Sequence, residues 1–514
     1  MLFNSYGFIF VFLPFTLLVF FALGRQSSRL ASLWLTASSF LFYGWWNPKY
    51  VALLILSIIF NYVIGMNLAK SYGSGHLIKN FRLLVVGISA NLLLLAYYKY
   101  TNFFLANVND VFETRFSIQE IILPIGISFY TFTQIAFLVD ASRGLAREYD
   151  FVHYCLFVTY FPHLISGPVL HHKEMMPQFS SSQTYRFDYD NMAIGLSIFF
   201  FGLFKKLVLA DNASGYSTPV FDAAAKGVDV ATLEAWGGAL CYAFQLYFDF
   251  SGYTDMAIGS SRMFGVKLPI NFFSPYKATN IIDFWRRWHI TLSRFLRDYL
   301  YIPLGGNRRG KLRRYVHLMI TMLLGGLWHG ANWTFMIWGC LHGIYLIINH
   351  VWQSFRGWLG YDINNSSLIY RMSCRCITFI FVVFAWVFFR SNSLQAAIIF
   401  IKGMLGFNGT SLPLGWLEDS EQNIFIQWLL SIGCKPALND MLFEGGNEVW
   451  LIGILLFISW FLPNTSEIFL NDRLKMNAYW QWQPTKTWLA ITIGVGFFAI
   501  LSISDMSEFI YFQF

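Results

Sequence analysis

Long apolar runs recur along the whole chain and set its class. They cover residues 8–23, 50–68, 83–97, 192–204, 376–389, 449–462 and 488–502. A helix of about 20 apolar residues crosses the hydrocarbon core of a bilayer, and many of these runs approach that length. The pattern therefore predicts an all-α polytopic membrane protein with about ten to thirteen spanning or re-entrant helices. No polar stretch is long enough for a soluble domain, so residues 1–514 are expected to form one integral-membrane domain.

Composition supports this class. The chain is 56% hydrophobic and 12% charged, and the charged fraction is about half of that in a soluble domain. The six cysteines show no spacing typical of a disulfide framework or a zinc site. Most of them lie in or beside apolar segments, so they are expected to be small buried hydrophobic residues, and no metal site is predicted.

The distribution of basic residues predicts the orientation. No Lys or Arg precedes the first apolar run, which argues against a signal peptide, and Arg25 and Arg29 follow it. Because cytoplasmic loops are enriched in Lys and Arg, these two residues are expected in the cytoplasm and Met1 outside. The same rule places the basic loop 70–82 inside. It places 407–448, which contains one Lys and no Arg, outside.

The strongest cluster of positive charge lies between residues 283 and 314. Nine of the 36 Lys and Arg residues of the chain are here, opposed within the segment by Asp283 and Asp298. Membrane segments flank the cluster, so nucleic-acid binding is not expected. A cytoplasmic membrane surface that also holds a phosphorylated ligand fits better. For most of these arginines, a solvated loop that only sets orientation is the alternative interpretation.

Within this cluster, residues 280–300 show helical periodicity. Apolar side chains such as Phe284, Trp288 and Leu292 share one face, and Arg287 and Arg294 share the other. We therefore predict that residues 280–314 form an interfacial amphipathic helix followed by a basic cytoplasmic loop. His289 lies at the edge of the apolar face, where it could point into the protein.

Other polar residues interrupt apolar segments. Asp249 and Asp255 lie in the segment 246–259, and the segments 160–172 and 123–140 carry further polar residues or proline and glycine. Irregular backbone at membrane depth is tolerated only where it is buried in protein or lines a watery cavity. Several such segments in one chain predict an internal chamber.

His329 stands in the apolar stretch "LLGGLWHGANW" (323–333). It could be a buried histidine that only packs, but an ionisable residue in a membrane segment is by default a functional candidate. Held in apolar surroundings, its ring would stay uncharged and could accept a proton from a hydroxyl that attacks an activated acyl group. The chain has no G-x-S-x-G motif, so a serine acyl-enzyme has no support.

Three long motifs resemble the membrane-bound O-acyltransferase family, and within it the bacterial branch of the alginate O-acetyltransferase membrane subunit. They are "DFSGYTDMAIG", "FWRRWHITLSRFLRDYLYIPLGGNRRG" and "LLGGLWHGANWTFMIWG". Shorter matches at 123–132, 160–169 and 384–391 extend the resemblance over most of the chain.

The resemblance implies a ring of helices around a central tunnel. The family's essential histidine corresponds to His329 and its second polar position to His289. The implied activity transfers acetyl from cytoplasmic acetyl-CoA across the bacterial inner membrane, where the acceptor is a cell-envelope or secreted polysaccharide such as alginate. A periplasmic or extracellular acetyltransferase is the implied partner protein. No permanently bound cofactor is expected.

The resemblance also gives roles to further residues. His329 would be the base, and His289 would orient or polarise the donor thioester. Asp249 and Asp255 would be either structural or tunnel-lining. The residues that would contact the substrates, some of them through the phosphates of coenzyme A, are Trp328, Asn332, Arg308, Arg309 and Arg313.

Two other functions are compatible with buried histidines in a membrane protein. His289 and His329 could ligate a haem or metal ion, which a Soret band would reveal. Alternatively, the chain could export a lipid-linked sugar without chemistry, and turnover of labelled acetyl-CoA would exclude this.

Overall fold

The computed structural model is almost entirely helical. It describes every residue except 73–76, 118–120, 147–149, 309, 361–366, 414–415, 417–423, 432–433, 437–441, 443–444, 471–479, 504–508 and 511–514. The centre of the basic loop 70–82, Arg309 and much of the segment 407–448 therefore lie outside the described residues.

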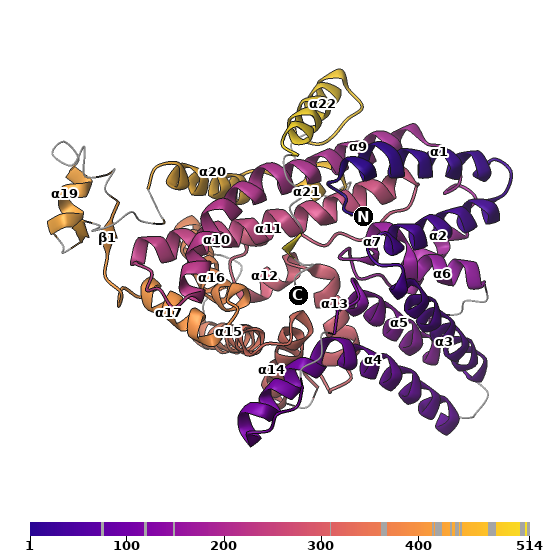
Figure 1. Cartoon of the computed structure of the whole chain (residues 1–514), viewed down its shortest axis with the longest axis horizontal. Helices are drawn as coiled ribbons and strands as arrows, with labels where there is room; N and C mark the ends of the chain where they lie inside the picture. The colour runs from indigo at the N-terminus through magenta and orange to yellow at the C-terminus, as the bar shows by residue number, and fades with distance from the viewer. Residues whose placement is uncertain are drawn as a thin grey trace.

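The N-terminal part of the chain forms a group of helices at one end of the molecule, drawn in indigo and violet in Figure 1. The elements are η1 (Gly7–Phe12), α1 (Leu13–Gly24), α2 (Ser28–Gly44), α3 (Lys49–Ser71), α4 (Leu77–Phe112), α5 (Ile127–Ser142), α6 (Phe151–Thr159), α7 (Phe161–Leu164) and α8 (His172–Phe179).

The central helix of the fold is α11 (Thr232–Met263), which follows α9 (Tyr189–Phe204), η2 (Lys205–Ala210) and α10 (Asp211–Ala225). Every residue from Cys241 to Ser261 is buried, so this part of α11 is enclosed on all sides, its two aspartates included. It packs closely on α9 because glycines meet: a Cβ on Gly202 would lie 2.6 Å from the carbonyl oxygen of Gly252.

The buried apolar residues fall into two clusters, and α11 contributes to both. Its C-terminal part, with Tyr253 and Met256, packs with the N-terminal helices. Its N-terminal part, with Phe244 and Phe250, packs with the later helices. The two halves of the molecule are therefore joined through one buried helix.

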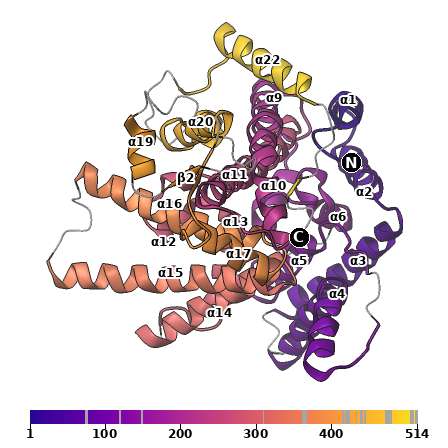
Figure 2. The same cartoon turned by 60° about the vertical axis from the view of Figure 1, so that its left-hand side comes forward.

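The second half of the chain holds both histidines of interest. Figure 2 shows α14, α15 and α16 together on the side away from α1 and α2. The elements of this second half of the chain are η3 (Pro275–Lys277), α12 (Ile281–Arg287), α13 (Ile290–Leu296), η4 (Arg297–Tyr301), α14 (Lys311–His329), α15 (Trp333–Trp358), α16 (Leu368–Arg390), α17 (Leu394–Met404), β1 (Ser411–Leu412), α19 (Ile424–Ser431), β2 (Lys435–Pro436), α20 (Asn447–Phe461), α21 (Thr465–Phe469) and α22 (Lys486–Leu501). The two-residue strands β1 and β2 pair in parallel.

Seven helices in the described part of the chain are long and apolar enough to cross a membrane. Six of the seven apolar runs named from the sequence fall within them, and the run 488–502 coincides with the shorter apolar helix α22. The seventh span is α15. The protein is thus an all-α polytopic membrane protein. The seven long spans among the described residues are fewer than the ten to thirteen predicted segments, a number that included re-entrant ones.

The prediction of one continuous amphipathic helix after residue 280 is wrong. α12 ends at Arg287, His289 adopts a left-handed conformation (φ 42°, ψ 54°), and α13 begins at Ile290. The apolar face is not in lipid either, because Phe284, Trp288 and Leu292 are all buried in the protein core. The break forms because the backbone N–H of Ile290 donates to the carbonyl oxygen of Asn271 (2.9 Å) instead of continuing the preceding helix.

Two ion pairs connect α11 to η2. Lys206 Nζ lies 2.7 Å from a carboxylate oxygen of Asp249, both side chains being 2% exposed, and 2.8 Å from Asp211. Lys205 Nζ lies 2.6 Å from Asp255, which also accepts a hydrogen bond from Thr465 of α21. Both aspartates predicted as structural or tunnel-lining thus make structural contacts.

We predict that Lys206→Met destabilises the fold. It should lower the free energy of unfolding by about 3–5 kcal/mol, because it leaves the charge of Asp249 buried and uncompensated. The thermal unfolding midpoint in detergent measures this effect, and adding Asp249→Asn should recover part of the loss.

Arg297→Gln is the matched control, since it breaks an ion pair with Asp298 in which Arg297 is 62% exposed. An exposed pair contributes only about 0–1 kcal/mol. Equal midpoints for Lys206→Met and the control would show that the buried pair does not hold α11.

Candidate functional site

His329 is placed by the close packing of α14 against α15. Any side chain at Gly326 would meet the carbonyl oxygen of Phe335, and any side chain at Gly339 would meet that of Met322. Small residues at these two positions therefore allow the two backbones to approach closely. His329 is the last residue of α14, and the chain turns directly after it into α15.

Aromatic rings surround His329. Its ring lies 4.9 Å from Trp328, 5.0 Å from Trp338 and 5.1 Å from Phe389, measured between ring centroids, and all three contacts are edge-to-face. The side chain is 4% exposed. An imidazole in such surroundings is shielded from water, which favours its uncharged form.

The end of α14 is held by two residues of α4. Lys99 Nζ donates to the carbonyl oxygens of Trp328 (2.6 Å) and His329 (3.1 Å), and Tyr100 Oη donates to that of Leu327 (2.8 Å). The last carbonyl groups of a helix have no partner within the helix, so these donors satisfy them. Sequence reasoning missed Lys99. The available signal was the single lysine among residues 83–112, the more apolar part of α4.

His289 lies at the break between α12 and α13, and it is fully buried. Its left-handed backbone is unusual for a residue other than glycine, and such strain is concentrated at functional sites. Asn271 holds it there, since its side-chain oxygen lies 3.1 Å from His289 Nδ1 and its carbonyl oxygen accepts from the N–H of Ile290. Asn271 was also missed by sequence reasoning.

The ring of Trp328 contacts both histidines. Its centroid lies 4.9 Å from that of His329 and 6.2 Å from that of His289. The same ring stacks on Phe132 of α5 at 5.2 Å. Two buried imidazoles from different segments therefore meet at one indole. Such a pair can take and return a proton without contact with bulk water.

His342 on α15 is also buried and lies beyond Trp338 from His329. Its centroid lies 4.8 Å from Trp338, and Trp338 in turn contacts His329. On its other side His342 contacts Tyr345, which lines a cavity of about 330 Å³ between α15 and α16. Neither His289 nor His329 lines this cavity. The predicted central tunnel stays a prediction.

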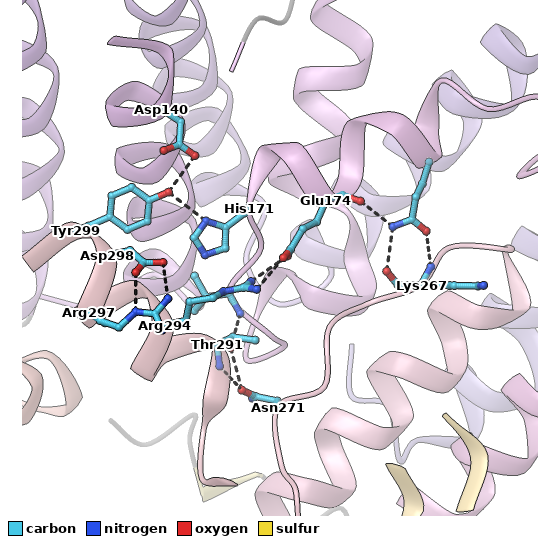
Figure 3. A network of polar contacts seen from close by, with 12 residues as sticks. Asp140, His171, Glu174, Lys267, Asn271, Thr291, Arg294, Arg297, Asp298 and Tyr299 are labelled. Carbon is cyan, nitrogen blue, oxygen red and sulfur yellow. Dashed lines mark hydrogen bonds and ion pairs between the residues drawn. The ribbon is translucent and has the colours of Figure 1, made fainter. Parts of the chain in front are cut away.

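The arginines of α13 and η4 are engaged in the protein. Figure 3 shows Arg294 bound through both of its Nη nitrogens to the carboxylate of Glu174 of α8, at 2.7 and 2.9 Å. Arg297 likewise makes two hydrogen bonds to Asp298. Glu174 comes from outside the basic segment, so its pairing was not visible in the charge pattern.

The same network connects α5, α8 and η4. Tyr299 Oη donates to Asp140 (3.0 Å) and lies 3.0 Å from Nδ1 of His171 (Figure 3). Burial, followed by the nearby Arg294 guanidinium, lowers the pKa of His171 to about 4. The ring is therefore neutral at pH 7. The hydroxyl proton of Tyr299 is used in the hydrogen bond to Asp140. The hydrogen bond between Tyr299 and His171 is therefore donated by Nδ1–H of His171 to the Tyr299 oxygen.

The remaining arginines of the predicted donor site lie at the other end of α14. Arg308 and Arg313 are exposed on either side of Gly310, whereas Arg309 lies outside the described residues. α14 contains 19 residues, so this end is about 28 Å from His329 along the helix axis. The predicted site residues are thus divided between a buried centre and an exposed basic loop.

Asn332 has a structural contact at the start of α15. Asn332 is the N-cap of α15, because its side-chain oxygen accepts a hydrogen bond from the N–H of Thr334 (3.0 Å). Its side-chain amide donates to the carbonyl oxygen of Asn392 (2.9 Å). It therefore fixes the turn that follows His329.

Comparison with known proteins gives one family. The model of the membrane-bound O-acyltransferase family matches residues 40–359, a range that includes Lys99, Asn271, His289 and His329. The chain is 40% identical to a peptidoglycan O-acetyltransferase of Helicobacter pylori, over 100% of this chain and 98% of that protein.

Further relatives carry related names. The chain is 40% identical to a probable alginate O-acetylase, AlgI, of Pseudomonas aeruginosa, over 79% of this chain and 75% of that protein. It is 28% identical to a teichoic acid D-alanyltransferase of Bacillus subtilis, over 53% of this chain and 70% of that protein. Because the family model matches and a named relative is 40% identical over nearly the full length of both proteins, the chain belongs to the membrane-bound O-acyltransferase family and is an O-acyltransferase.

Proposed function

We propose that the protein transfers acetyl from cytoplasmic acetyl-CoA to a hydroxyl on the outer side of the bacterial inner membrane, and so serves O-acetylation of a cell-envelope or secreted polysaccharide. The observation that carries the proposal is the meeting of two buried histidines, His329 and His289, at the ring of Trp328. The names of the relatives supply the acyl group and the class of acceptor.

The chemistry requires one base. The acceptor hydroxyl oxygen attacks the carbonyl carbon of the thioester while His329 takes the hydroxyl proton. The carbon–sulfur bond then breaks, and the imidazolium returns the proton to the departing thiolate, which leaves as coenzyme A with its thiol. His289 orients the reacting groups. Burial of both rings excludes water, which would otherwise hydrolyse the thioester.

Buried polar nitrogens beside His329 support a polar ligand in this region. In the described part of the chain, Nδ1 and Nε2 of His342 and Nε1 of Trp285 and Trp338 are buried and have no hydrogen-bond partner. A buried polar group without a partner costs about 1–3 kcal/mol. A donor that brings carbonyl oxygens into this region would recover part of that energy.

The exposed loop before α14 is proposed to bind the phosphates of the donor. Arg308 lies in this loop, Arg313 lies in the first turn of α14, and Arg309 adds to the charge in the sequence. Guanidinium groups bind phosphate through charge-assisted hydrogen bonds. This function needs the loop in the cytoplasm, which agrees with the positive-inside rule and with Met1 outside.

The acceptor is proposed to be peptidoglycan or an exopolysaccharide of the alginate type. Peptidoglycan is the first to test, because the relative named for it is 40% identical over nearly the whole chain, compared with 35% for a full-length relative named as a probable alginate O-acetylase. A periplasmic or extracellular acetyltransferase is proposed as the partner that receives the acetyl group or presents the glycan.

His329→Gln tests the function itself. Glutamine keeps a hydrogen-bonding group but cannot take a proton, and loss of a general base lowers rates by about 10²–10⁴. We expect His329→Gln and His329→Ala to abolish detectable transfer of labelled acetyl from acetyl-CoA. The assay uses inside-out membrane vesicles that contain the acceptor and the partner protein.

His289→Asn is the informative comparison in the same assay. The family resemblance implies that this position can be histidine or asparagine, and an orienting role needs no proton transfer, so this variant should retain activity where His289→Ala does not. All variants must first show the wild-type thermal midpoint. Near wild-type transfer by His329→Gln would show that His329 is not the base.

Replacing Arg308 and Arg313 together by Gln tests the donor site. The KM for acetyl-CoA should rise about tenfold or more, since a hydrogen bond to a charged group contributes about 1.5–3 kcal/mol. We expect kcat to change little, because these contacts hold donor and transition state alike. Arg25→Gln with Arg29→Gln is the matched control, as it removes the same charge at exposed positions near α2. Equal KM values in the two double variants would leave the loop with a role in orientation alone.

Lys99 provides a test of how the base is held. Lys99→Met removes the donors to the carbonyl oxygens of Trp328 and His329, so the end of α14 should shift and kcat should fall by about tenfold or more. Lys99→Arg keeps N–H donors and should retain more activity. Lys49→Met, at an exposed lysine of α3, is the control. A wild-type kcat for Lys99→Met would show that α14 does not depend on this cap.

A further inference from the structure

The side-chain oxygen of Asn271 lies at the centre of a small buried network. It is 3.1 Å from Nδ1 of His289, 3.2 Å from the backbone nitrogen of Thr291 and 2.8 Å from the hydroxyl of Thr291. Asn271 and His289 are both fully buried. Figure 3 shows Asn271 on an extended segment facing Thr291 of α13.

The contacts identify which end of the amide faces His289. A backbone N–H can only donate, so the Asn271 atom that faces the N–H of Thr291 must be the oxygen. The Thr291 hydroxyl accepts from the N–H of Val169 (3.0 Å), which leaves its own proton for the same Asn271 oxygen. The amide is therefore not free to present its NH₂ group to the histidine.

This geometry determines the tautomer of His289. An amide oxygen can only accept, so Nδ1 of His289 must carry the proton that it donates to Asn271. A neutral imidazole has a single N–H. Nε2 of His289 then carries the lone pair, and in the neutral ring it can only accept a hydrogen bond.

The backbone of Asn271 keeps the ring in place as well. Its carbonyl oxygen accepts from the N–H of Ile290, which follows the strained residue 289. The ring of His289 also packs edge-to-face on Phe250 of α11, with centroids 4.9 Å apart. Position and protonation of this histidine are thus controlled from one residue, Asn271.

We propose that Asn271 is a positioning residue that holds His289 in the Nδ1–H tautomer, so that Nε2 accepts a hydrogen bond from a hydroxyl of the acceptor glycan next to the one that reacts, and the proton of the reacting hydroxyl stays available to His329. The inference rests on the proposed function and changes one role in it. A neutral His289 with this tautomer cannot polarise the thioester carbonyl, because it has no proton on Nε2 to donate. It orients the acceptor instead, through that neighbouring hydroxyl. An asparagine at position 289 could replace it through its own side-chain oxygen.

The first test replaces Asn271 by Leu and by Asp. Asn271→Leu removes the oxygen that accepts the hydrogen bond from His289, so kcat should fall by about 10²-fold. This loss is smaller than the roughly 10⁴-fold loss that follows when a catalytic base adopts the wrong tautomer. The KM for acetyl-CoA should not change. Asn271→Asp keeps an acceptor oxygen and should retain most of the activity. Asn61→Leu, which breaks the buried pair of Asn61 with Asn91, is the control for loss of a buried amide and should keep the wild-type kcat.

A double-mutant cycle separates positioning from mere packing. In the His289→Asn background there is no tautomer to fix, so adding Asn271→Leu should have little further effect on kcat. An equal loss in both backgrounds would overturn the proposal. If Asn271→Leu has wild-type kcat while His329→Gln is inactive, this inference fails and the proposed function stands. Activity of His329→Gln would instead contradict the proposed function.

The tautomer can also be measured without any change at Asn271. Solid-state NMR of protein labelled with ¹⁵N-histidine distinguishes Nδ1–H from Nε2–H rings, and the His289→Asn spectrum identifies the signal of His289. We expect Nδ1–H. An Nε2–H signal at this residue would refute the inference, whether or not the Asn271 variants fold.

Discussion

A helix that ends inside a membrane protein leaves backbone groups that lipid cannot satisfy, so another part of the chain must supply their partners. Both histidines of the proposed site lie at such interruptions. His329 closes α14, and the carbonyl groups there are bound by Lys99 and Tyr100 of α4. His289 precedes α13, and the first donors of that helix are bound by Asn271. Satisfying the broken helix ends and positioning the two imidazoles are therefore the same task.

The partners at these breaks come from distant parts of the sequence, which requires the halves of the molecule to keep a fixed relation. Helix α11 provides it. Its residues belong to both apolar clusters, and its two aspartates are bound by consecutive lysines of η2. Phe250 on the same helix contacts the ring of His289. The buried ion pairs thus hold the helix whose Phe250 contacts His289.

The apolar runs predicted most of the spanning helices, because length and hydropathy are properties of a local stretch. His329 could be found for a similar reason, since an ionisable residue stands out against an apolar segment. The break at His289 could not be found. Residues 280–300 have the apolar and polar periodicity of one helix, and contacts of α12 and α13 with the distant residues Asn271 and Phe273 accompany the break between them. Lys99 and Glu174 were missed because their partners lie 230 and 120 residues away.

The separation between the basic loop and the histidines also has a physical meaning. α14 joins an exposed, positively charged end to a buried end surrounded by aromatic rings. The two ends therefore offer a ligand environments of different polarity. Phosphates are stable only at the first end, because moving charge into the apolar interior is expensive. A thioester is uncharged and can enter the second. A donor that carries both groups would therefore be oriented by the gradient of polarity along a single helix, with its reactive carbon at the end where His329 lies.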